Sequence, residues 1–239
     1  MRRFALILCG VVCLSQGAVA QARADSLDQD SLWSIPLTTS RVTFGIAMGV
    51  CGISAQDIVS IINQEMGTGV VSTNSFASAG FVEGTLSWRF ADRFDVAVSQ
   101  GFVSKSHSFG DIFSGATFYS YDLTHYKLAV HRTFVQDLYS VGVGIGGGYL
   151  SGVLRRTYSF EPSAPRLTAS GGFVMVEVVA RTPFWGRLFL HTSLHGAVTF
   201  SAPLRDAAGN AVRIFSQNPH DATFSSTEAA FALGFDYCF

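Results

Sequence analysis

The stretch that decides the fold closes the chain: Ala229-Ala230-Phe231-Ala232-Leu233-Gly234-Phe235-Asp236-Tyr237-Cys238-Phe239. Its large apolar side chains stand at every second position, namely Phe231, Leu233, Phe235, Tyr237 and Phe239. A β-strand points successive side chains to opposite faces, so one face of this strand is aromatic and the other is small or polar. Five large groups on a single face are typical of a barrel wall that faces lipid.

The same two-residue rhythm recurs in seven segments upstream, at residues 42–50, 82–90, 94–102, 126–131, 139–149, 174–181 and 188–200. With the last strand they make eight, and single-chain bacterial outer-membrane barrels have an even number of strands. Most of these segments are close to the 9–11 residues that a tilted strand needs to cross a bilayer. Because an open sheet edge would leave unpaired backbone groups in hydrocarbon, we predict an all-β fold, a closed antiparallel eight-stranded transmembrane β-barrel.

The connections between these segments alternate in length. Short ones lie at 91–93, 134–137 and 183–186, and long ones at 52–79, 104–117, 155–170 and 201–224. This alternation predicts short periplasmic turns and long extracellular loops. In the first long loop, Ser54 and Asp57 resemble the start of a helix, and the spacing of Ile58, Ile61, Ile62 and Met66 predicts one short amphipathic helix before Gly67. That helix is interpreted either as a lid packed on the barrel mouth or as an amphipathic element that gates an apolar entry or contacts a partner.

The amino terminus has the pattern of a secretory signal peptide over residues 1–22. Arg2 and Arg3 precede an apolar stretch, and Ala18-Val19-Ala20 offers a small-x-small cleavage site. Residues 23–40 are interpreted as a periplasmic lead-in and 41–239 as the barrel. No later apolar run reaches 18 residues, so the sequence predicts no membrane-spanning helix after the signal.

Composition excludes several classes of protein. Hydrophobic residues make up 48 % of the chain and charged residues only 14 %, which excludes a disordered chain. Without Arg2 and Arg3, 14 basic residues face 17 acidic ones, so no nucleic-acid partner is expected. Cys51 falls at the outer end of the first predicted strand and Cys238 at the inner end of the last. They should therefore lie at opposite ends of the barrel, too far apart to form a disulfide.

The inward-facing positions of the predicted strands carry a polar network. Its members are Glu83, Arg89, Asp95, Lys127, His131, Glu177, Arg181, Arg187, His191, His195, Glu228 and Asp236. An eight-stranded barrel is only wide enough for its side chains to fill, so buried charges there must pair or hold water. We expect Arg89 to pair with Asp95 and Glu177 with His191. The network is interpreted as a salt-bridged plug or, alternatively, as a path for protons or small ions.

No cofactor or metal is expected in this lumen. His191 and His195 have a helical ligand spacing, but on a strand they lie about 13 Å apart. The glycines at 142, 144, 146 and 148 stand inside a strand pattern and open no helix, so they are not a dinucleotide fingerprint. Because they place no side chains in the lumen, they either leave a cavity there or make room for bulky side chains on the facing strands.

The segment from Ala229 to Phe239 resembles the carboxyl-terminal β-signal of outer-membrane proteins, which implies recognition by the barrel insertion machinery. Length and strand number are similar to those of the small barrels that include OmpA transmembrane domains, OmpX, OmpW, the opacity adhesins, PagP and PagL. A helical first loop and an apolar mouth are most similar to OmpW, and that resemblance implies passage or binding of small apolar solutes. His191-Thr192-Ser193 also resembles the His-x-Ser pair of PagL-type lipid A deacylases, with Glu177 as a group that could orient His191. The pair points into the barrel, however, so no enzyme is expected.

Three functions therefore remain open for a chain surrounded by outer-membrane lipid. The first is passage or binding of small apolar solutes at the outer mouth, above a side-chain-filled lower lumen. The second is a surface adhesin or antigen that contacts host surface molecules through its extracellular loops. The third is the lipid A deacylase.

Overall fold

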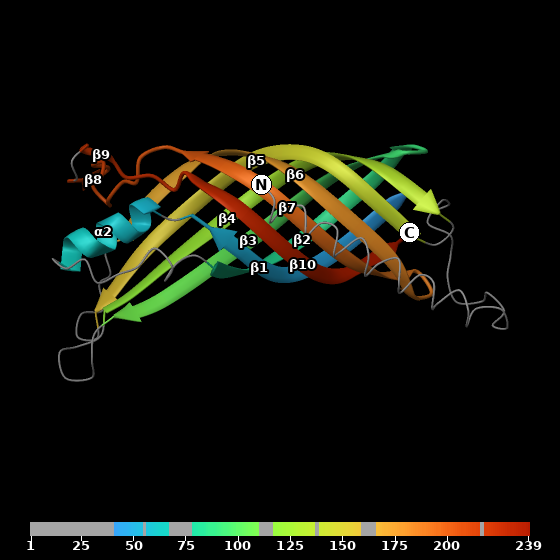
Figure 1. Cartoon of the computed structure of the whole chain (residues 1–239), viewed down its shortest axis with the longest axis horizontal. Coiled ribbons are helices and arrows are strands. Elements are labelled where there is room, and N and C mark those ends of the chain that lie inside the picture. Colours follow the sequence, from blue (N-terminus) through green and yellow to red (C-terminus); the bar gives the residue numbers. More distant parts are fainter. Residues whose placement is uncertain are drawn as a thin grey trace, which may run out of the picture. The chain divides into compact units, whose positions relative to one another are not determined.

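The computed structural model describes residues 41–54, 56–66, 78–109, 117–136, 139–158, 166–215 and 218–239. The predicted signal peptide and periplasmic lead-in lie outside these residues. Eight strands form a closed antiparallel barrel in the order β1-β10-β7-β6-β5-β4-β3-β2 (Figure 1). They are β1 (Val42–Ile53), β2 (Ser78–Ala91), β3 (Phe94–Phe109), β4 (Thr117–Gln136), β5 (Tyr139–Tyr158), β6 (Arg166–Trp185), β7 (Leu188–Ser201) and β10 (Ser226–Cys238). The predicted fold class is confirmed.

Alternation along the strands separates a lipid-type surface from a filled lumen. On β1 and β10 the outward residues are large, apolar and exposed, while Ala47, Cys51, Ala232 and Asp236 between them are buried. The five apolar residues of the closing strand all lie on the outside, as expected. Every backbone pair from Thr43↔Cys238 to Ile53↔Glu228 is in register, so the last strand seals the barrel against the first.

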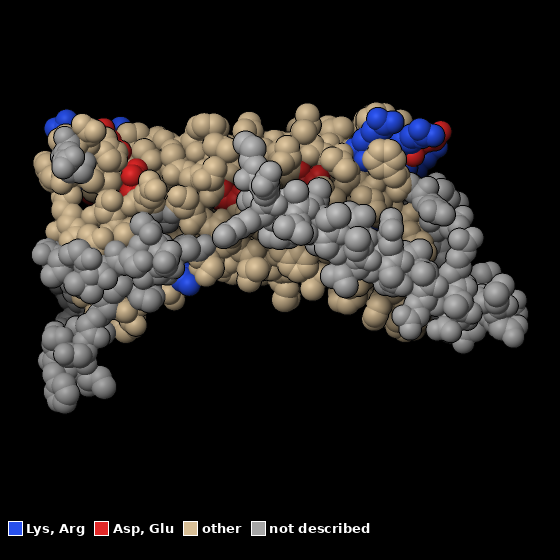
Figure 2. All heavy atoms as spheres, in the orientation of Figure 1, with Lys and Arg blue, Asp and Glu red and all other residues tan. Residues whose placement is uncertain are grey.

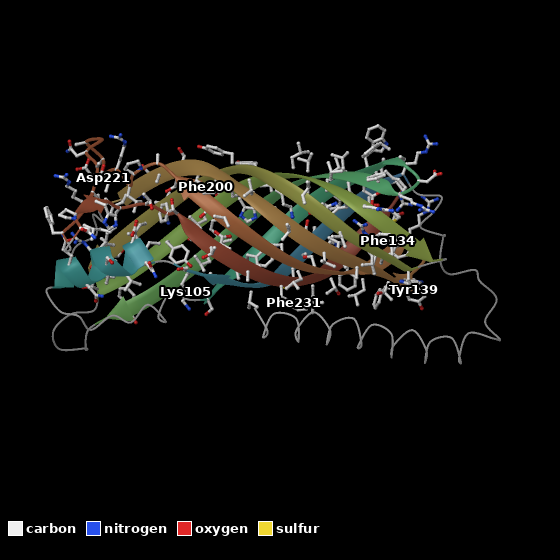
Figure 3. The ribbon with its side chains drawn as sticks, turned by 45° about the horizontal axis from the view of Figure 1, so that its top comes forward. Lys105, Phe134, Tyr139, Phe200, Asp221 and Phe231 are labelled. Atoms are coloured by element: carbon white, nitrogen blue, oxygen red, sulfur yellow. The ribbon has the colours of Figure 1, made fainter. Side chains whose placement is uncertain are left out.

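The two ends of the barrel differ. One end, here named the turn end, carries the β2–β3, β4–β5 and β6–β7 connections; the other, the loop end, carries α2 (Gln56–Met66) (Figure 1). Phe134 and Tyr139 lie at the turn end, whereas Lys105 and Asp221 lie at the loop end (Figure 3). An aromatic belt surrounds the turn end, with ring contacts that include Trp88–Phe90, Phe90–Phe94, Phe184–Phe235 and Tyr237–Phe239. Such belts mark membrane–water interfaces.

Two predicted boundaries were wrong. The strands are longer than predicted: β4, β5 and β6 each have 20 residues, because backbone pairing continues into the expected loops, for example to Phe109↔Thr117. The third turn is also shorter than the expected 183–186, since β6 runs to Trp185 and the chain reverses at Gly186, whose φ of 58° favours glycine.

A cap covers the loop end of the barrel. We define it as α2 together with the described residues of the 202–225 segment, which are 202–215 and 218–225 and include the small sheet of β8 (Arg213–Ile214) and β9 (His220–Asp221). Ile58, Val59, Ile61 and Ile62 of α2 are buried. They belong to one apolar core with Phe81, Val103, Tyr119, Tyr121, Leu123, Leu150, Leu154, Phe173, Leu204, Ile214 and Phe224. The helix therefore packs with its isoleucine face in the apolar core at the loop end, and the side chain of Met66 lies outside the described part. No helix among the described residues is long and apolar enough to cross a membrane.

Candidate functional site

The first candidate site is a buried ion-pair cluster near the turn end, here named the turn-end cluster. Arg89 Nε donates to Asp95 Oδ1 at 3.0 Å, as predicted, and Thr133 Oγ1 donates to Asp95 Oδ2 at 2.7 Å. Arg181 lies between two carboxylates: its Nε is 2.5 Å from Asp236 Oδ2 and its Nη1 is 3.8 Å from Asp95 Oδ2. These contacts join β2, β3, β4, β6 and β10 across the lumen at this level.

His191 belongs to the turn-end cluster. Its Nδ1 lies 3.0 Å from Asp236 Oδ1, and the ring is buried. The predicted pairing of His191 with Glu177 is therefore wrong. In the β6–β7 register His191 lies opposite Arg181, and Glu177 lies opposite His195, four residues further along the strand. That offset is about 13 Å at 3.3 Å per residue, which is beyond the reach of an ion pair.

The second candidate site is the mid-barrel cluster, which consists of Glu83, His125, Lys127, His131 and Glu177. Lys127 Nζ is 2.7 Å from Glu83 Oε1 and 3.1 Å from Glu177 Oε1, so one ammonium bridges β2 and β6 across the lumen. His131 Nε2 lies 3.0 Å from Glu177 Oε2. His125 Nε2 lies 3.5 Å from Glu83 Oε2. Both carboxylates therefore contact the same lysine and one histidine each.

The glycines of β5 make this second cluster possible. Gly144 lies opposite His131 of β4 on one side and opposite Glu177 of β6 on the other. Because β5 contributes no side chain there, His131 reaches across it to Glu177, and a Cβ at Gly144 would overlap the His131 ring. The glycines at 142, 144, 146 and 148, here named the glycine ladder, were expected either to leave a cavity or to make room for bulky side chains. At Gly144 the structure shows the second outcome.

Above the mid-barrel cluster lies a cavity of about 30 Å³. His125, His195 and Glu228 line it together with apolar residues, and His195 packs edge-on against Phe81 at 5.8 Å between ring centroids. Ser226 Oγ donates to Glu228 Oε1 at 3.2 Å. A cavity of this size holds about one or two water molecules, because each needs at least 10–15 Å³. It is too small for an organic solute.

One carboxylate of α2 joins the two parts of the cap. Asp57 Oδ2 accepts two hydrogen bonds from Thr223, one from the backbone N–H at 2.9 Å and one from the side-chain hydroxyl Oγ1 at 3.0 Å. His220 Nε2 lies 3.3 Å from Asp57 Oδ1. The hydrogen bond of His220 with the Asn218 carbonyl and the nearby Asp57 carboxylate raise the pKa of His220 above its usual range. Asp57 thus binds the 202–225 segment through its carboxylate. Its position near the start of the helix had suggested only a local role at the helix terminus.

Most of the predicted lumen residues are where the alternation placed them. Buried inside the barrel are Glu83, Asp95, Lys127, His131, Glu177, Arg181, His191 and Asp236, while Arg89 and Glu228 are half-buried. Arg187 is a correction: it is exposed in the β6–β7 turn, because the strand begins only at Leu188. His125 and Thr133 were missed, although they continue the inward alternation of Lys127 and His131 in both directions along β4. No group of three or more His, Cys, Asp or Glu in the described part of the chain is arranged to hold a metal ion.

Comparisons with known proteins identify the fold alone. No protein-family model matches the chain, and no curated protein matches it. The structure is similar to that of a major outer membrane protein from Thermus thermophilus, with a TM-score of 0.52 and 13 % identity over 83 % of this chain and 99 % of that chain. It is also similar to Neisserial surface protein A (NspA), with a TM-score of 0.51 and 8 % identity over 83 % and 97 % of the two chains. Both likenesses support an outer-membrane type of barrel.

Proposed function

We propose that this chain resides in the outer membrane as a sealed barrel and acts as a binding module, with its cap as the surface offered to partners outside the cell. The observation that carries the proposal is the closure of the lumen at three levels: the turn-end cluster, the mid-barrel cluster and the cap. A barrel closed in this way cannot conduct solutes without rearrangement. Its exposed outer end is then the part available for function.

The cap offers a surface suited to macromolecular contact. Phe215 beside β8 is 73 % exposed, although its backbone is held by a hydrogen bond from its N–H to Gln64 Oε1 at 3.1 Å. Arg213 and Asp221 flank it in exposed positions. An exposed aromatic ring on a fixed backbone, surrounded by polar groups, is the arrangement found at binding hot spots. Loop-end surfaces of this kind fit an adhesin or antigen that contacts host surface molecules.

Two measurements test this proposal. Purified protein in a planar lipid bilayer should give no solute-sized conductance steps; stable open channels in the unmodified protein would refute the sealed barrel. Binding to a panel of extracellular matrix proteins should fall more than tenfold in Phe215→Ala, as expected for a hot-spot residue. Phe184→Ala, which removes an exposed ring at the opposite end of the barrel, is the matched control and should bind normally. Absence of any binding across the panel, or equal loss in both variants, would refute the role of the cap.

A second candidate function is OmpW-like binding of small apolar solutes. It is favoured by the apolar face of α2, where Ile58 lines a small pocket with Tyr121 and Leu123 of the upper lumen. If α2 moved, it would uncover a chamber lined by these side chains. Deletion of residues 54–66 should then create conductance or solute uptake that the unmodified protein lacks. An equally silent deletion variant that still folds would exclude this candidate.

The deacylase interpretation is the weakest of the three. His191 and Ser193 are buried inside the barrel, and His191 contacts Asp236 and not a serine hydroxyl. A catalytic histidine must lie within hydrogen-bond reach of its nucleophile, and the nucleophile must meet the lipid. We therefore expect Ser193→Ala to leave the lipid A of the host cell unchanged, as mass spectrometry of extracted lipid would show.

A further inference from the structure

Arg132 occupies an unusual place on the outside of the barrel. It follows Val130 and precedes Phe134 on the outward face of β4, and its own side chain is exposed. It is paired with Phe94 on the neighbouring strand β3 and with Val143 on the neighbouring strand β5. All four surrounding side chains are apolar and between 42 and 52 % exposed. A guanidinium among lipid-facing side chains costs about 2–4 kcal/mol at the bilayer midplane but only about 0–1 kcal/mol near the interface, where lipid phosphates are within its reach.

Among the described residues, none supplies an anion that pairs with Arg132, because no carboxylate of theirs lies within ion-pair distance of its guanidinium. Its contact is aromatic, because the guanidinium carbon lies 5.3 Å from the centroid of the Phe134 ring. That stacking holds the guanidinium at the level of the aromatic belt, where lipid headgroups begin.

A second arginine lies beside this position. The carbonyl of Arg93, in the β2–β3 turn, accepts a hydrogen bond from the backbone N–H of Thr133 at 2.8 Å, so the turn is adjacent to Arg132 along β4. The Arg93 side chain is exposed. Among the described residues of the β2–β3 turn and the end of β4, Arg93, Arg132 and Asp92 together carry one excess positive charge. Figure 2 shows Lys and Arg atoms gathered at this end of the barrel.

We propose that Arg132 and Arg93, with the ring of Phe134 beside them, form a binding site for the phosphate of an anionic phospholipid in the leaflet at the turn end. Guanidinium groups bind phosphate in a bidentate geometry. The apolar neighbours of Arg132 provide the surface along which the acyl chains lie. The excess positive charge gives a preference for an anionic headgroup, such as phosphatidylglycerol, over a zwitterionic one.

Trp88 provides a local probe for this site. On the same outward face it lies two strands away from Val130, through Trp88↔Val96 and Val96↔Val130, and Arg132 is two residues further along β4. At the usual strand spacing and rise, Trp88 and Arg132 are therefore about 12 Å apart. In a Trp33→Phe, Trp185→Phe background, brominated phosphatidylglycerol and brominated phosphatidylcholine are titrated into vesicles that contain the folded protein. Quenching of Trp88 fluorescence gives the affinity ratio of the two lipids at this part of the wall.

The expected result is selective quenching by brominated phosphatidylglycerol, with the selectivity reduced about fivefold in Arg132→Gln, the factor for one arginine near an anionic headgroup. Arg187→Gln removes an exposed arginine from the neighbouring β6–β7 turn at the same end and should leave the selectivity unchanged. Equal quenching by the two lipids in the unmodified background would overturn the proposal. So would full selectivity in Arg132→Gln, or an equal loss in Arg187→Gln, which would indicate a general effect of charge.

Discussion

Removal of Lys127 should be the most damaging single change in the lumen. Its Nζ lies 2.7 and 3.1 Å from two glutamate oxygens, and its side chain is only 3 % exposed. At an effective dielectric constant of about 20, these distances give about 6 and about 5 kcal/mol of attraction. Much of that attraction offsets the desolvation of three charges, so the expected net loss in Lys127→Ala is about 3–5 kcal/mol, the range for breaking a buried pair. The physical reason is that Glu83 and Glu177 remain buried without their shared cation.

The assay is equilibrium unfolding in guanidinium chloride of protein reconstituted into vesicles, followed by tryptophan fluorescence and by heat-modifiable migration on gels. Two further substitutions provide the control. In the triple variant with Glu83→Gln and Glu177→Gln, the carboxylates left behind by Lys127→Ala become neutral, and a large part of the lost stability should return. A loss below about 1 kcal/mol in Lys127→Ala would refute the reasoning, because that is the size of a surface ion pair. The reasoning would also be refuted if the triple variant were less stable than Lys127→Ala alone.

Three other predictions concern the glycine ladder, the cap and the turn. Gly144→Ala should destabilise the barrel by about 1–3 kcal/mol, since its Cβ overlaps a buried ring, whereas Gly84→Ala, which has open space around it, should fold normally in the same assay. Because the pKa of His220 is raised, its contact with Asp57 stabilises the cap below the ordinary value near 6.5 and is lost as pH rises through the raised value. The protection factors of the α2 amides, which are corrected for the intrinsic rise of exchange rates with pH, should therefore fall as the pH rises above about 6.5, and the same fall in His220→Gln would contradict this. Arg187→Gln should change the free energy of unfolding by less than about 0.5 kcal/mol, and a larger loss would mean that the residue contacts the lumen after all.

The lumen shows why the inward residues were predictable and their partners were not. Alternation alone assigns Lys127 and Glu177 to the interior, because a strand has only two faces. Which of these charges meet depends on the stagger between neighbouring strands, and that stagger places His191 opposite Arg181 instead of Glu177. The contact between His131 and Glu177 skips a strand entirely, which no neighbour-based pairing would predict.

The cap shows a similar limit. The spacing of isoleucines in α2 predicts a helix with one apolar face, and the structure has that helix with its isoleucines buried in one core with Leu204, Ile214 and Phe224. The tie between Asp57 and Thr223 joins residues that are 166 positions apart. Only closure of the barrel brings the first loop beside the last one.

The amino-acid sequence by itself determined the two-faced strands, their number, the closed barrel and the short helix, since each follows from local periodicity and from the need to satisfy every backbone group in lipid. The tertiary structure alone decided strand register, the extension of the strands into the expected loops, the two separate ion-pair clusters and the exposed place of Arg187. The physical reason is that side-chain direction is a property of one strand, whereas a contact across the lumen depends on how all eight strands are staggered around the barrel.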